Sequence, residues 1–72
     1  MAKPMLAEAR RRRGLSANEL GRRAGVAGST IRRIESGVPP HMKTITKIAR
    51  ALECAPEIID WPGDPFGMGA WR

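Results

Sequence analysis

Arginine is the side chain whose number and spacing in this sequence could do chemistry. Ten of the thirteen basic residues are arginines, and eight of them form runs at residues 10–13, 22–23 and 32–33. A guanidinium group is planar and always charged, and its paired N–H groups match phosphate oxygens and the O6 and N7 atoms of guanine. Residues 1–50 carry a net charge of +9, and residues 51–72 a net charge of −3. This distribution is typical of a surface that binds nucleic acid, although any single run could also be a solvated helix face.

Other chemistries find little support among the 72 residues. Cys54 and His41 are the only cysteine and histidine, so neither a disulfide framework nor a zinc site is expected. Cys54 lies at a hydrophobic position that favours the core over a nucleophile, and the sequence has no carboxylate pair and no glycine-rich phosphate loop. We therefore expect no enzyme activity, no catalytic residue, no metal, no cofactor and no small-molecule substrate.

Hydropathy and the N-terminal segment bear on where the protein works. No apolar run approaches the roughly 18 residues that a membrane-spanning helix needs. The N-terminal segment lacks the apolar stretch and cleavage site of a secretory signal. We expect a cytoplasmic, nucleoid-associated protein without a membrane partner.

Apolar periodicity predicts an all-α domain of five helices. Apolar residues recur at helical spacing, and no segment alternates with period two. Gly14, Gly25 and Gly37 are expected to end the first three helices, because glycine readily adopts the left-handed conformation found there. Pro39 and Pro40 interrupt the chain before the fourth helix. The predicted helices cover residues of about 5–13, 17–24, 28–36, 44–52 and 56–60. Residues 1–61 are expected to form one domain, followed by an irregular tail at 62–72.

Residues 16–36 contain the most informative pattern. Ser16 and Glu19 have the spacing of a capping box at a helix N-terminus. Gly21 allows the third helix to approach the second closely, and Gly25 provides the positive φ that a tight turn needs. The side chains expected to point inward are Leu20, Ala24, Val26, Ile31 and Ile34. These spacings are those of a helix-turn-helix unit.

Residues 6–60 resemble the phage repressor and Cro type of DNA-binding domain, an XRE-like family of compact five-helix domains, and in particular its small single-domain controllers. The matching segments are LAEARRRRGLSANELGRRAGVAGSTIRRIESG and TITKIARALECAPEII. The resemblance implies that the third helix enters the major groove of double-stranded DNA and that the protein acts as a homodimer. It also implies a buried ion pair between Arg10 and Glu35. Glu35 follows an inward-facing isoleucine, so a partly shielded carboxylate there needs a cation, although a solvated glutamate is the alternative.

The resemblance and the outward face of the third helix together predict the DNA contacts. The expected base contacts are Gly28, Ser29, Arg32 and Arg33. The expected phosphate contacts are Arg10, Ser16, Ala17, Thr30, Ser36, Gly37 and Lys43. Phosphate or solvent is the alternative for Arg32, and helix capping is the alternative for Ser29 and Thr30.

The sequence departs from the family at three positions of this unit. The family often has glutamine at Ala17, a serine or threonine cap at Ala27, and a long polar base reader at Gly28. Alanine in place of an N-cap hydroxyl costs about 1 kcal/mol, so we expect the third helix to fray at its start. With fewer base readers, the arginines must supply more of the affinity, which predicts steep salt dependence and modest specificity.

The C-terminal part of the chain is predicted to mediate self-association. Ile58, Ile59 and Trp61 form an apolar end that one small domain is not expected to bury, and they match the region where the family dimerises; core packing is the alternative. All three aromatic residues, Trp61, Phe66 and Trp71, lie in the last twelve positions. We expect the tail to fold across the dimer seam or against the first helix, with a disordered end as the alternative.

The prediction is therefore a sequence-selective regulator of transcription, a repressor or dual controller, that binds double-stranded DNA as a homodimer on a two-fold operator. A protein-interaction module with the same fold, such as an antitoxin or antiactivator, is the alternative. RNA or single-strand binding is less favoured, because residues 1–50 contain no aromatic side chain on which bases could stack.

Overall fold

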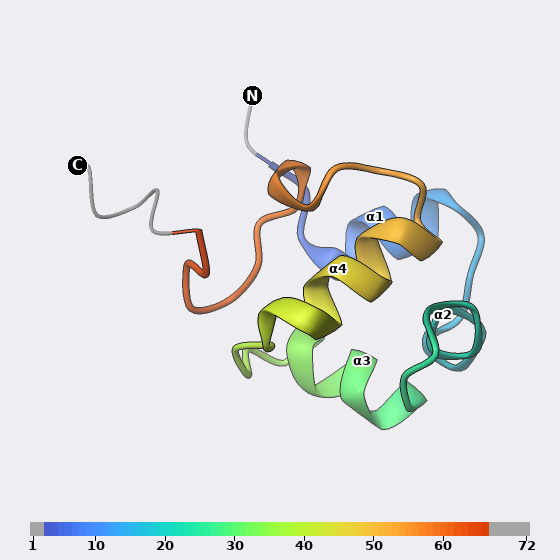
Figure 1. Cartoon of the computed structure of the whole chain (residues 1–72). Coiled ribbons are helices and arrows are strands. Elements are labelled where there is room, and N and C mark those ends of the chain that lie inside the picture. The colour runs from blue at the N-terminus through green and yellow to red at the C-terminus, as the bar shows by residue number, and fades with distance from the viewer. Residues whose placement is uncertain (1–2, 67–72) are drawn as a thin grey trace.

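Four α-helices make up most of the computed structural model, which describes residues 3–66 (Figure 1). Within that range the protein has no strand, only an isolated parallel bridge between Met5 and Asp60. Helix α2 packs mainly against α3 and α4. The elements in chain order are α1 (Leu6–Arg12), α2 (Ala17–Ala24), α3 (Gly28–Glu35), α4 (Met42–Ala51) and the 3-10 turn η1 (Pro56–Ile58). The predicted all-α class is confirmed, and none of these helices is long and apolar enough to cross a membrane.

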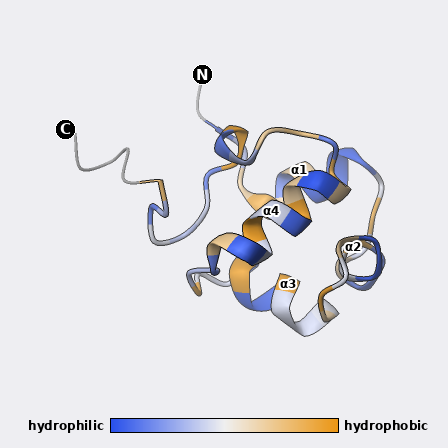
Figure 2. Cartoon of the chain, in the orientation of Figure 1, coloured by the Kyte–Doolittle hydropathy of each residue, from blue (hydrophilic) through white to orange (hydrophobic). Residues whose placement is uncertain are grey.

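One apolar side of each helix forms a single core. Leu20, Ile31, Ile45 and Ile48 are completely buried where α2, α3 and α4 meet. Along α4, hydrophobic and hydrophilic positions alternate around the helix, so that only one side faces the core (Figure 2). The core holds the helices in fixed positions and leaves their charged sides exposed.

The prediction of a fifth helix over residues 56–60 is wrong. Helical conformation lasts only for the three residues of η1, and the backbone of Ile59 is extended, with φ −96° and ψ 140°. The next residue, Asp60, donates its backbone N–H to the carbonyl of Pro4 at 2.8 Å. Pairing with the N-terminal segment thus replaces the next helical hydrogen bond and ends the turn.

Helix α4 begins two residues earlier than expected. Met42 and Lys43 were predicted to lie in the loop after Pro39 and Pro40, but both are helical. His41 is the N-cap, and its extended backbone makes the transition from the prolines to the helix. Lys43 consequently projects from the first turn of α4.

The described part of the tail lies against the loop between α3 and α4. A Cβ atom added to Gly63, whose φ is +83°, would come within 2.7 Å of the Cβ of Pro39. Phe66 is half-buried against the core. The tail was expected at the first helix or a dimer seam. Its first residues approach this loop, and Pro62 also lines a pocket with Leu6 and Ala7 of α1. The dimer seam stays a prediction, and Trp71 lies outside the described residues.

Candidate nucleic-acid interface

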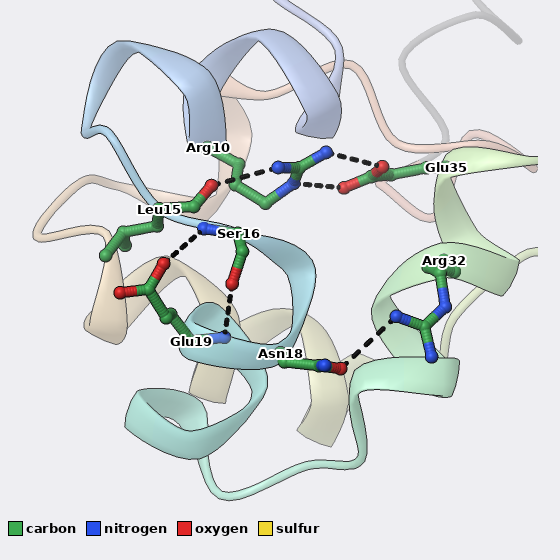
Figure 3. A network of polar contacts seen from close by, with 7 residues as sticks. All are labelled: Arg10, Leu15, Ser16, Asn18, Glu19, Arg32 and Glu35. Carbon is green, nitrogen blue, oxygen red and sulfur yellow. Dashed lines mark hydrogen bonds and ion pairs between the residues drawn. The ribbon is translucent and has the colours of Figure 1, made fainter.

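A reciprocal capping box starts α2. The hydroxyl of Ser16 accepts a hydrogen bond from the backbone N–H of Glu19 at 3.0 Å, and the Glu19 carboxylate accepts from the backbone N–H of Ser16 at 2.9 Å (Figure 3). Hydrogen bonds from the Ser16 backbone and side chain lower the pKa of Glu19, and the charges of Arg22 and Arg23 add to this effect. The predicted start of α2 is therefore confirmed.

The turn from α2 to α3 depends on two glycines. Gly25 has φ +76° and ψ 30°, a left-handed conformation that favours glycine. A Cβ atom on Gly21 would lie 2.7 Å from the carbonyl oxygen of Val26 and 3.0 Å from the backbone nitrogen of Gly28. The turn and the start of α3 therefore pack on α2 at a distance that only glycine permits at residue 21.

An ion pair fixes α3 to α1. The Nε and Nη2 atoms of Arg10 donate to the two carboxylate oxygens of Glu35 at 2.7 and 3.0 Å, and Nη1 donates to the carbonyl of Leu15 at 2.9 Å (Figure 3). The side chains of Arg10 and Glu35 are only 14% and 15% exposed. The hydrogen bonds to Glu35 raise the pKa of Arg10, although burial opposes the charge. Every guanidinium nitrogen of Arg10 has a protein acceptor, which speaks against its expected role as a phosphate contact.

The outward side of α3 carries two exposed arginines. Ile31 and Ile34 point into the core, whereas Ser29, Arg32 and Arg33 are exposed. Arg33 has no ion pair or side-chain hydrogen bond among residues 3–66, so its guanidinium is available to a ligand. Arg32 donates from Nη1 to the Oδ1 atom of Asn18 at 3.2 Å. Both guanidinium groups remain accessible, as base contact requires.

The other expected contact residues differ in their accessibility. Ser36, Gly37 and Lys43 are exposed beyond the C-terminal end of α3 and at the start of α4. Ser16 is exposed but its hydroxyl already caps α2, and Thr30 is half-buried. The side chain of Ala17 is buried in the core, so a phosphate could meet only its backbone.

Asn18 is the residue of this surface that sequence reasoning missed. It is exposed on the first turn of α2, and its side chain reaches across to the start of α3 (Figure 3). A Cβ atom on Gly28 would collide with the Asn18 Oδ1 atom. The glycine at position 28 indicated that space is needed there. The sequence alone does not show that Asn18 on α2 fills this space, because that depends on how the two helices pack.

The apolar C-terminal end is largely part of the core. Ile59 and Trp61 are 2% and 3% exposed, so the expectation that one domain could not bury them is wrong. The extended backbone at Ile59 directs both side chains inward, and the Trp61 Nε1–H donates to the carbonyl of Pro56 at 2.7 Å. Ile58 alone of the three is exposed, at 52%. Nearby, Cys54 packs against the core, and burial raises the pKa of its thiol.

Comparison with known proteins identifies the fold. A helix-turn-helix family model matches residues 6–59, which is three quarters of the chain. No curated protein and no solved structure gives a significant match. The matched residues include the capped α2, the glycine turn and the outward arginines of α3. The chain belongs to the helix-turn-helix family, as a DNA-binding domain of the Cro and XRE-like type found in regulators of transcription.

Proposed function

We propose that this protein is a sequence-selective regulator of transcription, a repressor or dual controller, that binds double-stranded DNA as a homodimer on a two-fold operator. The observation that carries the proposal is the division of α3 into two sides. Ile31 and Ile34 are buried, while Arg32 and Arg33 are both exposed on the outward side. A helix whose inner side is packed against the core can enter the major groove as a rigid unit and present its guanidinium groups to base edges.

Base and phosphate contacts divide between α3 and its flanks. Arg32 and Arg33 would each donate to guanine O6 and N7, which is worth about 1–3 kcal/mol of discrimination per base pair. Ser36, Gly37 and Lys43, all exposed near the C-terminal end of α3, would contact the phosphates that border the groove. This arrangement supports binding with a strong dependence on salt concentration.

The homodimer is inferred from the size of the recognition unit and from the exposed apolar side chains. One helix-turn-helix unit covers half of a typical site, and a second copy related by two-fold symmetry covers the other half. Met5 and Ile58 are 58% and 52% exposed, on the two segments that the bridge between Met5 and Asp60 brings together. We infer that these side chains meet their counterparts in the second copy.

The test is selection of binding sites from a randomised double-stranded DNA library, followed by footprinting at two salt concentrations. We expect a two-fold repeat with half-sites about 10 base pairs apart. Arg32→Ala and Arg33→Ala should each weaken binding to the selected site by about 1–3 kcal/mol and relax the preference at one base pair. Arg50→Ala is the matched control, because it removes the same charge from an exposed position at the end of α4. Equal losses in all three variants, or uniform coating of the DNA, would contradict sequence-selective binding by α3.

A further inference from the structure

Asn18 belongs to α2 but occupies space above the first residue of α3. Its Oδ1 atom lies where a Cβ atom of residue 28 would stand, and the Cγ and Cα atoms of Asn18 would be 3.2 Å from that position. Gly28 therefore accommodates the asparagine side chain. The same Oδ1 atom accepts the hydrogen bond from Arg32 at 3.2 Å, which places the two side chains side by side on the exposed surface (Figure 3).

This contact changes the chemistry that Asn18 can offer to DNA. A free asparagine side chain presents an acceptor and a donor, and this pair matches the N6 and N7 atoms of adenine. Here the acceptor is engaged by Arg32, so the Nδ2 donors of Asn18 and the other N–H groups of Arg32 remain. One lone pair of the Oδ1 atom is left as an acceptor, but the N–H groups outnumber it, so donors dominate the combined surface.

A surface dominated by donors discriminates between the purines. Guanine presents two acceptors in the major groove, N7 and O6, whereas adenine presents the N7 acceptor and the N6 donor. Opposite adenine, one N–H group of a guanidinium fixed in this orientation would face the N6 amino group. That N–H group and the N6 amino group are both donors, so neither would have an acceptor. Opposite guanine, both acceptors would be satisfied.

We propose that Asn18 is a positioning residue that orients Arg32 to select guanine over adenine. Gly28 has no side chain and so leaves the room that this contact requires. The proposal rests on the proposed DNA-binding function and specifies which residue, outside α3, sets its base preference. Asn18 and Arg32 are both exposed, so a hydrogen bond between them contributes little to folding stability. Its effect should therefore appear in base preference and leave the melting temperature unchanged.

The experiment measures base preference at the position that Arg32 reads. Sites are first selected from a randomised duplex library, and that position is identified as the one at which Arg32→Ala loses its preference. Competition titrations then compare duplexes with guanine or adenine at this position for the wild type, Asn18→Leu, Asn18→Asp and Gly28→Ala. Leucine is close in size but has no acceptor, aspartate keeps the acceptor, and the alanine methyl group displaces the asparagine side chain.

Asn18→Leu and Gly28→Ala should each reduce the preference for guanine over adenine about tenfold. Their combination should lose no more than either variant alone, because both remove the same hydrogen bond. Asn18→Asp should keep the preference while binding all duplexes more weakly, because its charge repels phosphates. An unchanged preference in Asn18→Leu, or equal losses in Asn18→Asp and Asn18→Leu, would overturn the inference. If the wild type selects no site at all, the proposed function itself fails, which is a separate result.

Discussion

Arg10 on α1 and Glu35 at the end of α3 form a two-pronged ion pair across 25 residues of sequence. The third nitrogen of the same guanidinium group binds the carbonyl of Leu15, directly before the capping residue of α2. One nearly buried side chain therefore connects the first helix, the loop before α2 and the end of α3. The orientation of α3 depends on this connection as well as on the apolar core.

Removing one partner of this pair should destabilise the protein. Arg10→Met leaves the Glu35 carboxylate nearly buried without its cation, and we expect a loss of about 2–4 kcal/mol in the free energy of unfolding. Replacing both residues with methionine should cost less than the sum of the two single changes, because no uncompensated charge remains. Urea denaturation of the three variants measures both effects, and additive losses would show that the two side chains are not coupled.

Gly21→Ala should destabilise the packing of α2 against the turn. The new methyl group would lie 2.7 Å from the backbone oxygen of Val26, which cannot rotate away as a side chain can. We expect a loss of about 1–3 kcal/mol, measured by thermal unfolding. Gly28→Ala is the contrasting variant, since the closest atom to its methyl group is the movable end of the Asn18 side chain, and the Asn18 Cα atom is farther away at 3.2 Å, so we expect a smaller loss. A loss in Gly28→Ala as large as that in Gly21→Ala would refute this distinction.

Adding a cap to α3 should stabilise the protein. Ala27 is the N-cap of α3, with an extended backbone and no side-chain hydrogen bond within the described structure. Its φ of −67° and ψ of 144° suit serine, so Ala27→Ser should gain about 0.5–1.5 kcal/mol of unfolding free energy. The converse variant, Ser16→Ala, should lose a similar amount at α2, where the cap is present. No gain in Ala27→Ser would mean that the first backbone N–H groups of α3 already have other hydrogen-bond acceptors.

The charge of Glu19 should make stability depend on pH in the acidic range. Its hydrogen bonds with Ser16 lower the pKa in the folded protein, so the folded state binds the proton less readily than the unfolded chain. The resulting stabilisation is present above the pKa of the unfolded chain and is lost as the pH falls through the lower, folded value. We expect Glu19→Gln to have a lower melting temperature than the wild type at about pH 7 and to approach it at about pH 3. A difference that is constant across this range would exclude the charge as its cause.

Self-association should depend on Ile58 and not on its buried neighbour. Ile58→Glu places a charge on the exposed apolar surface without disturbing the core, because this side chain is already half in solvent. We expect the variant to sediment as a monomer and to bind a two-fold site about tenfold more weakly than the wild type. Val38→Glu, a similarly exposed apolar position in the loop after α3, is the control for sedimentation alone, because its charge would lie beside the proposed phosphate contact at Gly37. An unchanged sedimentation coefficient in Ile58→Glu would place the dimer contact elsewhere.

Features set by neighbouring residues were predictable from the sequence. The capping box at Ser16, the left-handed Gly25 and the inward side of α3 follow from short-range spacing, and the structure contains all three. The end of the domain was not predictable in this way. Ile58 and Ile59 are chemically identical neighbours, and the extended backbone at Ile59, together with the pairing of Asp60 with the N-terminal segment, accompanies the burial of Ile59.

The contact of Asn18 with Arg32 likewise depends on how separate segments of the chain pack together. Periodicity places Asn18 on the exposed side of α2, but its reach over Gly28 depends on the close packing of the two helices that Gly21 permits. The sequence thus predicted the two exposed arginines of α3 and missed the neighbour on α2 to which one of them donates a hydrogen bond. Contacts between helices require the relative positions of the helices, which short-range spacing does not provide.

The bridge between Met5 and Asp60 also bears on circular permutation of the protein. Because the hydrogen bond from Asp60 to Pro4 holds these two segments next to each other, a short linker placed after the buried Trp61 could join the C-terminal end of the core to the N-terminal segment. New termini could then be opened in the exposed loop around residues 38–41, which connects α3 to α4. Such a circular permutant would keep all four helices and give up the contact of Gly63 with Pro39, while reversing the order in which the two halves of the domain leave the ribosome.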